Sequence, residues 1–157
     1  MNAPRQPLIV HAEQAERIDF PHGGGFRLLA DASDTGAAVG ANRLTLPRGA
    51  TGAPAHHHAR STEVFYVLEG SARFTLDDRT TTVAAGGLLC IPPGHVHAFG
   101  ASPAATADLL VLLTPAVDRF DYFRTLGRIR HGLDTFAALL PEQDCYDVHF
   151  APADTPQ

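Results

Sequence analysis

Three consecutive histidines, residues 56–58 of the stretch HHHARSTEVFYVLEG, stand directly before an apolar segment. Side chains two residues apart on an extended strand share a face, so His56 and His58 are predicted to point together while His57 points away. Glu63 opens the apolar segment that follows. Two imidazoles and a carboxylate that converge from neighbouring strands are a ligand set for a transition metal ion.

A fourth candidate ligand, His97, follows a Pro-Pro-Gly turn further along the chain. With three neutral imidazoles and one carboxylate, a six-coordinate ion keeps two positions open for water, substrate or dioxygen. We therefore expect one divalent transition metal ion per chain. This ligand set accepts iron, manganese, nickel, cobalt, copper or zinc.

His95 is a candidate catalytic residue, because parity places it on the same strand face as His97. In that position it would line the cavity, or hydrogen bond to the second ring nitrogen of a ligand histidine. The alternative is a partly exposed strand histidine with no function.

The elements that must position these side chains are short strands, because apolar and polar residues alternate in runs separated by Gly and Pro. Many short antiparallel strands in one domain usually close into a barrel or stack as a sandwich, which removes open sheet edges. The sequence VLEGSARF predicts a tight hairpin turn around Glu69 and Gly70. The predicted strands are residues 26–30, 39–46, 54–58, 63–69, 72–76, 79–84, 88–91, 95–99 and 107–114.

After residue 114 the pattern changes to a helical one. Thr114 as a cap, Pro115 at the first helical position and Gly127 as a stop predict one helix. A second helical segment ends at Pro141 and places four apolar side chains on one face. These side chains are Leu133, Phe136, Ala137 and Leu140. The chain is thereby divided into an N-terminal arm, a barrel and a C-terminal helical appendage, over residues 1–25, 26–114 and 115–157.

Composition and charge exclude several classes of function. The chain has 157 residues, the length of one domain, and a formal net charge of −5 without a Lys/Arg run, so no surface for nucleic acid or anionic lipid is expected. No apolar stretch is long enough to span a bilayer, and the N-terminus lacks the apolar segment of a signal peptide. Cys90 and Cys145 do not make a disulfide framework, and two lone thiols fit a reducing cytoplasm.

The spacing of these residues resembles the two sequence motifs of the cupin superfamily. The first motif is G-x5-H-x-H-x(3,4)-E-x6-G, and Gly49 stands one residue too early for its leading glycine. The second motif is G-x5-P-x-G-x2-H-x3-N, and Ala101 replaces its closing asparagine. The residues that match the first motif are His56, His58, Glu63 and Gly70. The residues that match the second are Gly86, Pro92, Gly94 and His97.

This resemblance implies an all-β, single-domain barrel of the jelly-roll type with short C-terminal helices. It implies a metal ion inside the barrel with His56, His58, Glu63 and His97 as ligands. The tail is similar to that of small cupins described as quercetin-dioxygenase-like. The resemblance also implies a homodimer, in which the apolar strand face of Val64, Tyr66 and Leu68 forms the interface or instead packs under the appendage.

Three functions are compatible with such a site. The first is a metal-dependent oxygenase of a small enolic or aromatic compound, in which Glu63 is the fourth ligand or the base that removes an enol or phenol proton. Phe65, Val67 and Phe99 would form the apolar wall for such a ring. The second is a Lewis-acid cyclase or isomerase of a polyketide-like substrate, in which Glu63 or His95 transfers a proton. The third is a non-catalytic domain that binds a small ligand or a metal.

The arginines of the tail have two interpretations. The simpler one is that they form the solvated side of the terminal helices. The other is that one of them covers the mouth of the barrel and contacts an anionic group. These arginines are Arg119, Arg124, Arg128 and Arg130.

Overall fold

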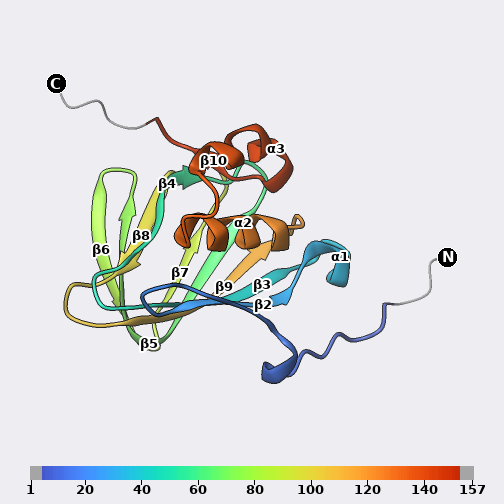
Figure 1. The fold of residues 1–157 in the computed structure, drawn as a ribbon, viewed down its shortest axis with the longest axis horizontal. Helices are drawn as coiled ribbons and strands as arrows, with labels where there is room; N and C mark the ends of the chain where they lie inside the picture. The colour runs from blue at the N-terminus through green and yellow to red at the C-terminus, as the bar shows by residue number, and fades with distance from the viewer. Residues whose placement is uncertain (1–4, 153–157) are drawn as a thin grey trace.

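A curled antiparallel sheet forms the body of the molecule, as predicted for an all-β chain (Figure 1). The computed structural model describes residues 5–152. The strands are β1 (Glu16–Asp19), β2 (Gly25–Ala30), β3 (Gly40–Leu46), β4 (Thr51–His57), β5 (Thr62–Leu76), β6 (Arg79–Ala84), β7 (Leu88–Ile91), β8 (His97–Ala101), β9 (Ala107–Thr114) and β10 (His149–Phe150). The helices are α1 (Ala32–Thr35), α2 (Phe120–Arg130) and α3 (Gln143–Tyr146), with 3-10 turns at Ala12–Gln14 and Phe136–Glu142.

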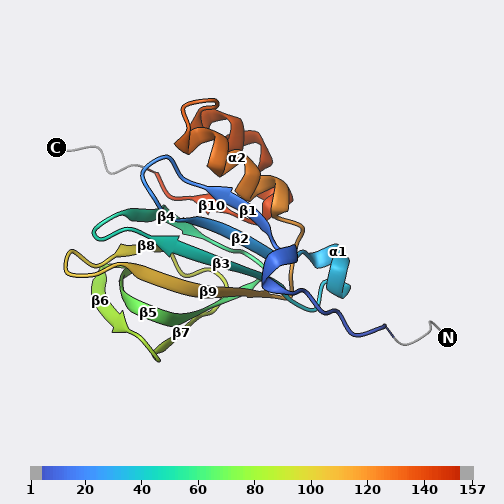
Figure 2. The same cartoon turned by 60° about the horizontal axis from the view of Figure 1, so that its bottom comes forward.

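The sheet has two halves that share β5. One half runs β1-β2-β3-β9-β5, with β7 paired to β5, and the other runs β5-β8-β4-β10, with β6 paired to β5. The helix α2 lies across the open side of this curled sheet (Figure 2). No helix among residues 5–152 is both long enough and apolar enough to cross a membrane.

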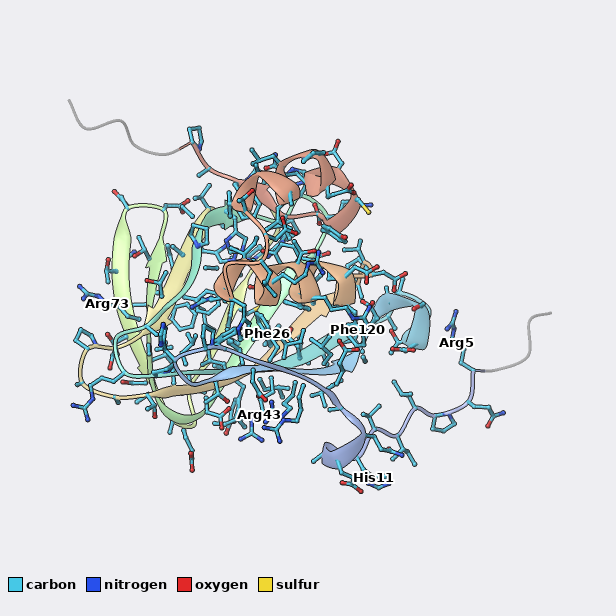
Figure 3. The ribbon with its side chains drawn as sticks, viewed as in Figure 1. Arg5, His11, Phe26, Arg43, Arg73 and Phe120 are labelled. Atoms are coloured by element: carbon cyan, nitrogen blue, oxygen red, sulfur yellow. The ribbon has the colours of Figure 1, made fainter. Side chains whose placement is uncertain are left out.

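Side chains alternate between a buried inner face and a polar outer face of the sheet. Phe26 of β2 points into the core, whereas Arg43 of β3 and Arg73 of β5 point outward (Figure 3). Arg43 forms an ion pair with Asp108 of the neighbouring strand β9 on this outer face. The period of two read from the sequence is therefore the period of the folded strands.

The predicted hairpin turn around Glu69 and Gly70 is wrong, because β5 runs through both residues. Gly70 has a φ of +71°, and a Cβ atom there would overlap the carbonyl oxygen of Thr106. Residues before it pair with β9 and residues after it pair with β8, with a register shift between Val67 and Glu69. The glycine therefore marks the bend at which one strand passes from one half of the sheet to the other.

The hairpin turn lies instead at Asp77 and Asp78, between β5 and β6. Leu76 and Arg79 are paired across it, so the loop has two residues. Asp77 adopts a φ of +53°, a left-handed conformation that aspartate tolerates and two-residue hairpin loops need.

The N-terminal arm contributes strand β1, which the sequence pattern did not predict. Glu16–Asp19 pairs antiparallel with β2 and so extends the sheet edge. Residues 1–4 of the arm and 153–157 of the appendage lie outside the described residues.

The first helix of the appendage begins at Phe120, not at Pro115, and it does not stop at Gly127. Asp31 supplies its cap from another element, since its carboxylate accepts hydrogen bonds from the backbone N–H groups of Arg119 (2.6 Å) and Phe120 (3.1 Å). Gly127 lies against Ile18 of β1, where a Cβ atom would overlap the Ile18 side chain. This glycine therefore permits close packing within the helix and does not end it.

The second predicted helix is a 3-10 segment with a different buried face. Leu133 and Leu140 are exposed, at 76% and 48%, whereas Leu139 is buried. Pro141 lies inside the segment and does not end it. The predicted face assumed a period of 3.6 residues, and the 3-10 geometry has a period of 3.0. After this segment, β10 pairs with β4 and returns the chain to the barrel.

Candidate metal centre and its pocket

Four buried side chains meet at one end of the barrel: His56, His58, Glu63 and His97. Each offers a ligand atom, and these atoms all lie within 4.8 Å of one another. His56 and His97 face each other across the β4–β8 pair, and Glu63 comes from β5. His57 points to the other side of β4 and stacks on His149, with ring centroids 5.0 Å apart. The parity expected from the sequence therefore holds along residues 56–58.

Each of the three imidazoles is oriented by a backbone carbonyl group. The Nδ1–H group of His56 donates to Pro54 O (2.7 Å), that of His58 to Asp147 O (2.7 Å) and that of His97 to His95 O (2.9 Å). A carbonyl oxygen only accepts, so Nδ1 carries the proton in each neutral ring. The Nε2 lone pairs are thus left free on the side that faces the centre.

The donor set fits a bound metal ion. Nε2 of His58 and Nε2 of His97 are buried, and neither has a hydrogen-bond partner among the described residues. Glu63 Oε2 lies 2.9 Å from His58 Nε2, and Oε1 lies 3.5 Å from His97 Nε2, but these contacts are not aligned as hydrogen bonds. Buried polar atoms without partners are costly, and a shared divalent ion would satisfy all of them together.

Burial and neighbouring charges set the protonation of the site. Burial lowers the pKa of His56 to about 3, so this imidazole is neutral at pH 7. Burial raises the pKa of Glu63, but the adjacent imidazoles and the Arg119 guanidinium outweigh this effect and hold it well below its usual value. Burial lowers the pKa of His97, and its contact with Glu63 overcomes this and raises it. Glu63 is therefore a carboxylate, the form that binds a metal ion.

Arg119, directly before α2, reaches back into the site. The residue is 7% exposed, and its Nη2 lies 3.4 Å from Glu63 Oε2. Its guanidinium lies over the rings of Tyr122 (5.9 Å) and Phe123 (5.5 Å). Of the four tail arginines, this one is buried at the barrel mouth, in agreement with the second interpretation of the sequence.

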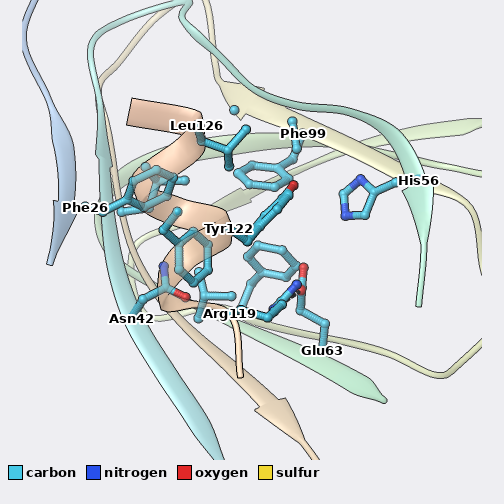
Figure 4. A pocket seen from close by; sticks show the side chains of 14 residues that line it. Phe26, Asn42, His56, Glu63, Phe99, Arg119, Tyr122 and Leu126 are labelled. Carbon is cyan, nitrogen blue, oxygen red and sulfur yellow. Dashed lines mark hydrogen bonds and ion pairs between the residues drawn. The ribbon is translucent and has the colours of Figure 1, made fainter. Parts of the chain in front are cut away.

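A pocket adjoins the four ligands under α2 (Figure 4). His56 and Glu63 form its metal-facing end, and its walls are mostly apolar. The free space of about 50 Å³ is enough for a few water molecules, so a substrate-sized ligand needs the pocket to widen. The apolar and aromatic lining residues are Phe26, Leu44, Phe65, Phe99, Val111, Tyr122, Phe123 and Leu126.

Two of the three residues predicted to form the substrate wall line the pocket, and the third does not. Phe65 and Phe99 line the pocket with ring centroids 5.0 Å apart. Val67 is buried in the hydrophobic core and does not reach the pocket. It lies two residues further along β5, next to the register shift that carries the strand away from the site.

His95 does not share the face of His97, because residues 92–96 form a turn ahead of β8. Its side chain is exposed and its Nδ1 lies 3.4 Å from Asp77 Oδ2. The catalytic assignment of His95 is therefore not supported by its position, and only its backbone carbonyl takes part, by orienting His97.

Sequence reasoning missed Asp147 and Tyr122. The Asp147 carboxylate, fully buried, accepts hydrogen bonds from the N–H groups of Ala59 (2.8 Å) and Arg60 (3.0 Å), while its carbonyl holds His58. Tyr122 and Arg119 are three residues apart on one helical face, a spacing that signals a shared surface. No periodicity in the sequence says that this surface closes the barrel.

The comparisons with known proteins agree with this fold. The Cupin domain family matches residues 42–113. No curated protein matches the chain. KdgF from Halomonas sp. has a similar structure, with 20% identity, a TM-score of 0.61, and coverage of 74% of this chain and 99% of KdgF.

Two further solved structures are similar at the same level. Streptomyces Pac13 with uridine is 19% identical, with a TM-score of 0.58 over 74% of this chain and 88% of its own. A predicted oxalate decarboxylase from Thermotoga maritima is 20% identical, with a TM-score of 0.58 over 68% of this chain and 98% of its own. Identities this low show a shared fold alone. Residues 42–113 thus match the Cupin domain model, and the described part of the chain has a jelly-roll fold similar to that of cupin structures.

Proposed function

We propose that this protein is a metal-dependent enzyme, and that it is an oxygenase of a small enolic or aromatic compound. The observation that carries this proposal is the contact between the four-ligand site and a pocket walled by aromatic rings. A bound divalent ion would supply open coordination positions and, if it is a redox metal, a route for electrons from the substrate to dioxygen.

The residues of the chain hold and orient a flat substrate. Phe65 and Phe99 present ring faces and edges to the pocket beside His56. The two rings contact each other edge to face and form one wall of the pocket. A flat apolar body that packs against this wall leaves its polar oxygen atoms at the only end of the pocket with a carboxylate among the described lining residues, Glu63. The apolar walls also exclude water from the reacting end.

Two observations support the two roles proposed for Glu63. Its low pKa keeps it charged, which suits a fourth ligand. The same carboxylate lies 3.4 Å from Arg119, so rotation away from the metal would leave it paired with that guanidinium and available to accept an enol or phenol proton.

A second candidate function is a Lewis-acid cyclase or isomerase. The observation that favours it is the Tyr122 hydroxyl, which lines the pocket without a hydrogen-bond partner among residues 5–152. Burial raises the pKa of Tyr122, so the group remains protonated and can donate a proton or a hydrogen bond. Pac13, whose fold is similar, is described as a nucleoside dehydratase, an enzyme that does not need dioxygen.

The experiment compares the protein loaded with iron, manganese, nickel or copper against the zinc-loaded protein. Zinc polarises a carbonyl group but has no redox chemistry. An oxygenase consumes oxygen with an enolic aromatic substrate panel in the redox-metal forms and not in the zinc form, measured with an oxygen electrode. Product formation by the zinc form at equal rates in argon and in air would exclude the oxygenase and leave the cyclase or isomerase.

The variant Glu63→Gln tests the role of the Glu63 carboxylate in turnover. It retains the shape of the side chain, so turnover is expected to fall more than substrate binding. A non-catalytic binding domain would show ligand binding with no product in any metal form, and that result would contradict both candidate enzymes.

A further inference from the structure

Two polar side chains at the start of α2 border the pocket. Arg119 and Tyr122 are 7% and 6% exposed, and both line the pocket. The Tyr122 ring separates Phe99 from Arg119, with its hydroxyl on the side that faces His56, while the Arg119 guanidinium lies beside Glu63 (Figure 4). Two polar groups from one helical face therefore border the metal-facing end of the pocket.

The hydrogen-bonding capacity of Arg119 is mostly unused. A guanidinium has five N–H donors. Its side chain makes one hydrogen bond to a described residue, the 3.4 Å contact with Glu63. None of its other nitrogen atoms is among the fully buried atoms of the described residues that lack a partner, so these donors are accessible from the pocket that Arg119 lines, where a ligand acceptor can reach them.

The charges of the residues that line the pocket indicate the charge of the ligand that it binds. Among the described residues that line it, Glu63 is the only acid and Arg119 the only arginine or lysine, so the two cancel when no ion is present. A divalent ion on the four ligands would add two positive charges in a mostly apolar enclosure. The charge balance of the loaded site therefore favours a ligand that carries negative charge.

We infer that Arg119 and Tyr122 form a recognition site for a substrate that is a planar apolar acid. In this site the Arg119 guanidinium binds the carboxylate group of the substrate through its planar pair of N–H donors. The Tyr122 hydroxyl donates a hydrogen bond to a second oxygen atom on the side of His56. This inference rests on the proposed function for the presence of a substrate, and it adds the class of compound that the pocket selects.

The test is direct binding of two probes, benzoate and its neutral analogue benzamide, measured by isothermal titration calorimetry on the metal-free and the zinc-loaded protein. Benzoate is expected to bind more tightly than benzamide, and more tightly to the zinc-loaded form. Arg119→Met is expected to weaken benzoate binding by about 10–100-fold, the effect of losing a hydrogen bond to a charged group, with little effect on benzamide.

Three variants separate recognition from structure. Arg119→Lys keeps the charge without the planar fork and is expected to recover part of the affinity. Arg128→Met removes an exposed arginine from the same helix and should leave the binding of both probes unchanged. Tyr122→Phe should weaken binding of both probes several-fold, because each carries an oxygen acceptor. Metal content and thermal unfolding are measured for every variant.

Equal affinity for benzoate and benzamide, equal losses in Arg119→Met and Arg128→Met, or no binding of either probe at millimolar concentration would each overturn the inference. These readouts do not depend on turnover. A protein that binds zinc and prefers benzoate but forms no product contradicts the proposed function alone. A protein that turns over neutral substrates and ignores the charge of the probe contradicts only the recognition site.

Discussion

At the scale of single residues, the site depends on hydrogen bonds that fix which nitrogen of each imidazole faces inward. The three Nδ1–H groups donate to main-chain carbonyl groups, and carbonyl groups do not change their protonation. These hydrogen bonds therefore hold the three Nε2 atoms toward the centre independently of the ion. Their orientation needs little reorganisation on binding, which favours affinity.

The first prediction compares two adjacent histidines. His58→Ala removes a ligand whose Nε2 faces the centre, and we expect metal affinity to fall at least about 100-fold. His57→Ala removes a side chain that stacks on His149 outside the site, so metal content should not change. Metal analysis of the purified variants measures both, and equal losses would refute the ligand assignment.

Asp147 connects the tail to the metal centre through its main-chain carbonyl group and its side-chain carboxylate. Its carbonyl orients His58, and its carboxylate accepts two backbone N–H groups from the segment that follows His58. Burial raises the pKa of Asp147, but these N–H groups outweigh burial and lower it. The appendage thus supports the ligands as well as the pocket.

The second prediction follows from this connection. Asp147→Ala leaves the part-buried N–H groups of Ala59 and Arg60 without their acceptor, so we expect a loss of about 3 kcal/mol in the free energy of unfolding. Metal affinity should fall about tenfold, because the main-chain carbonyl that orients His58 remains but the segment that follows His58 loses its anchor. Urea unfolding and metal titration measure the two effects. Asp144→Ala, whose side chain is fully exposed, is the control, and a matching effect there would exclude the proposed role of Asp147.

Residue spacing predicted the ligands well and the supporting residues poorly. His56, His58 and Glu63 lie close together in the sequence, so strand parity alone decides which of them share a face. Asp147 and Arg119 are separated from the sites they serve by more than 50 residues, and only the tertiary path of the tail brings them there. The error at His95 has a local cause, because the Pro-Pro-Gly turn delays the start of β8 and parity does not apply before it.

At the scale of elements, the central feature is the single long strand β5. It carries Glu63 near its start and the core residue Phe74 near its end, and it pairs with strands of both halves of the sheet. In the sequence, Glu69 and Gly70 lie between two runs of alternating apolar and polar residues, a pattern that resembles a hairpin turn. A bend inside a strand and a turn between strands can both contain a glycine with positive φ, and only the pairing partners distinguish them.

The third prediction tests this bend. Gly70→Ala places a Cβ against the carbonyl oxygen of Thr106 in a left-handed conformation, so we expect a loss of more than about 3 kcal/mol in the free energy of unfolding. Gly86→Ala has the same sign of φ but open space around the added Cβ, and about 1 kcal/mol is expected. Chemical unfolding of both variants gives the comparison. A cost at Gly70 no greater than at Gly86 would show that the close approach to Thr106 is unimportant.

At the scale of the whole molecule, an apolar area remains on the outside of the sheet. Tyr66 and Leu68 of β5 and Leu88 of β7 are 39%, 37% and 62% exposed, and Tyr66 and Leu88 are direct neighbours across the two strands. Within the described part of the chain, this face is not covered by the appendage, which packs on β1 and β2 instead. Exposed apolar areas of this kind are typical of interaction surfaces.

The fourth prediction is that this outer face forms the interface of a homodimer. The double variant Tyr66→Glu and Leu88→Glu is expected to be a monomer at concentrations where the unmodified protein is a dimer. Light scattering coupled to size-exclusion chromatography measures the mass. Leu133→Glu, at a position 76% exposed on the tail, should retain the dimer. A monomeric unmodified protein would contradict the prediction directly.

The position of α2 across the barrel mouth has a consequence for how such chains diversify. Among the described residues, the four candidate ligands come from barrel residues 56–97, whereas Tyr122 reaches the pocket from α2 and Arg119 from the residue before it. Mutations in α2 can therefore change the pocket without replacing a ligand, so the same four-ligand site can serve different compounds. Two proteins with the same histidine and glutamate spacing need not share a substrate, and the helix sequence is the better guide to which compounds each accepts.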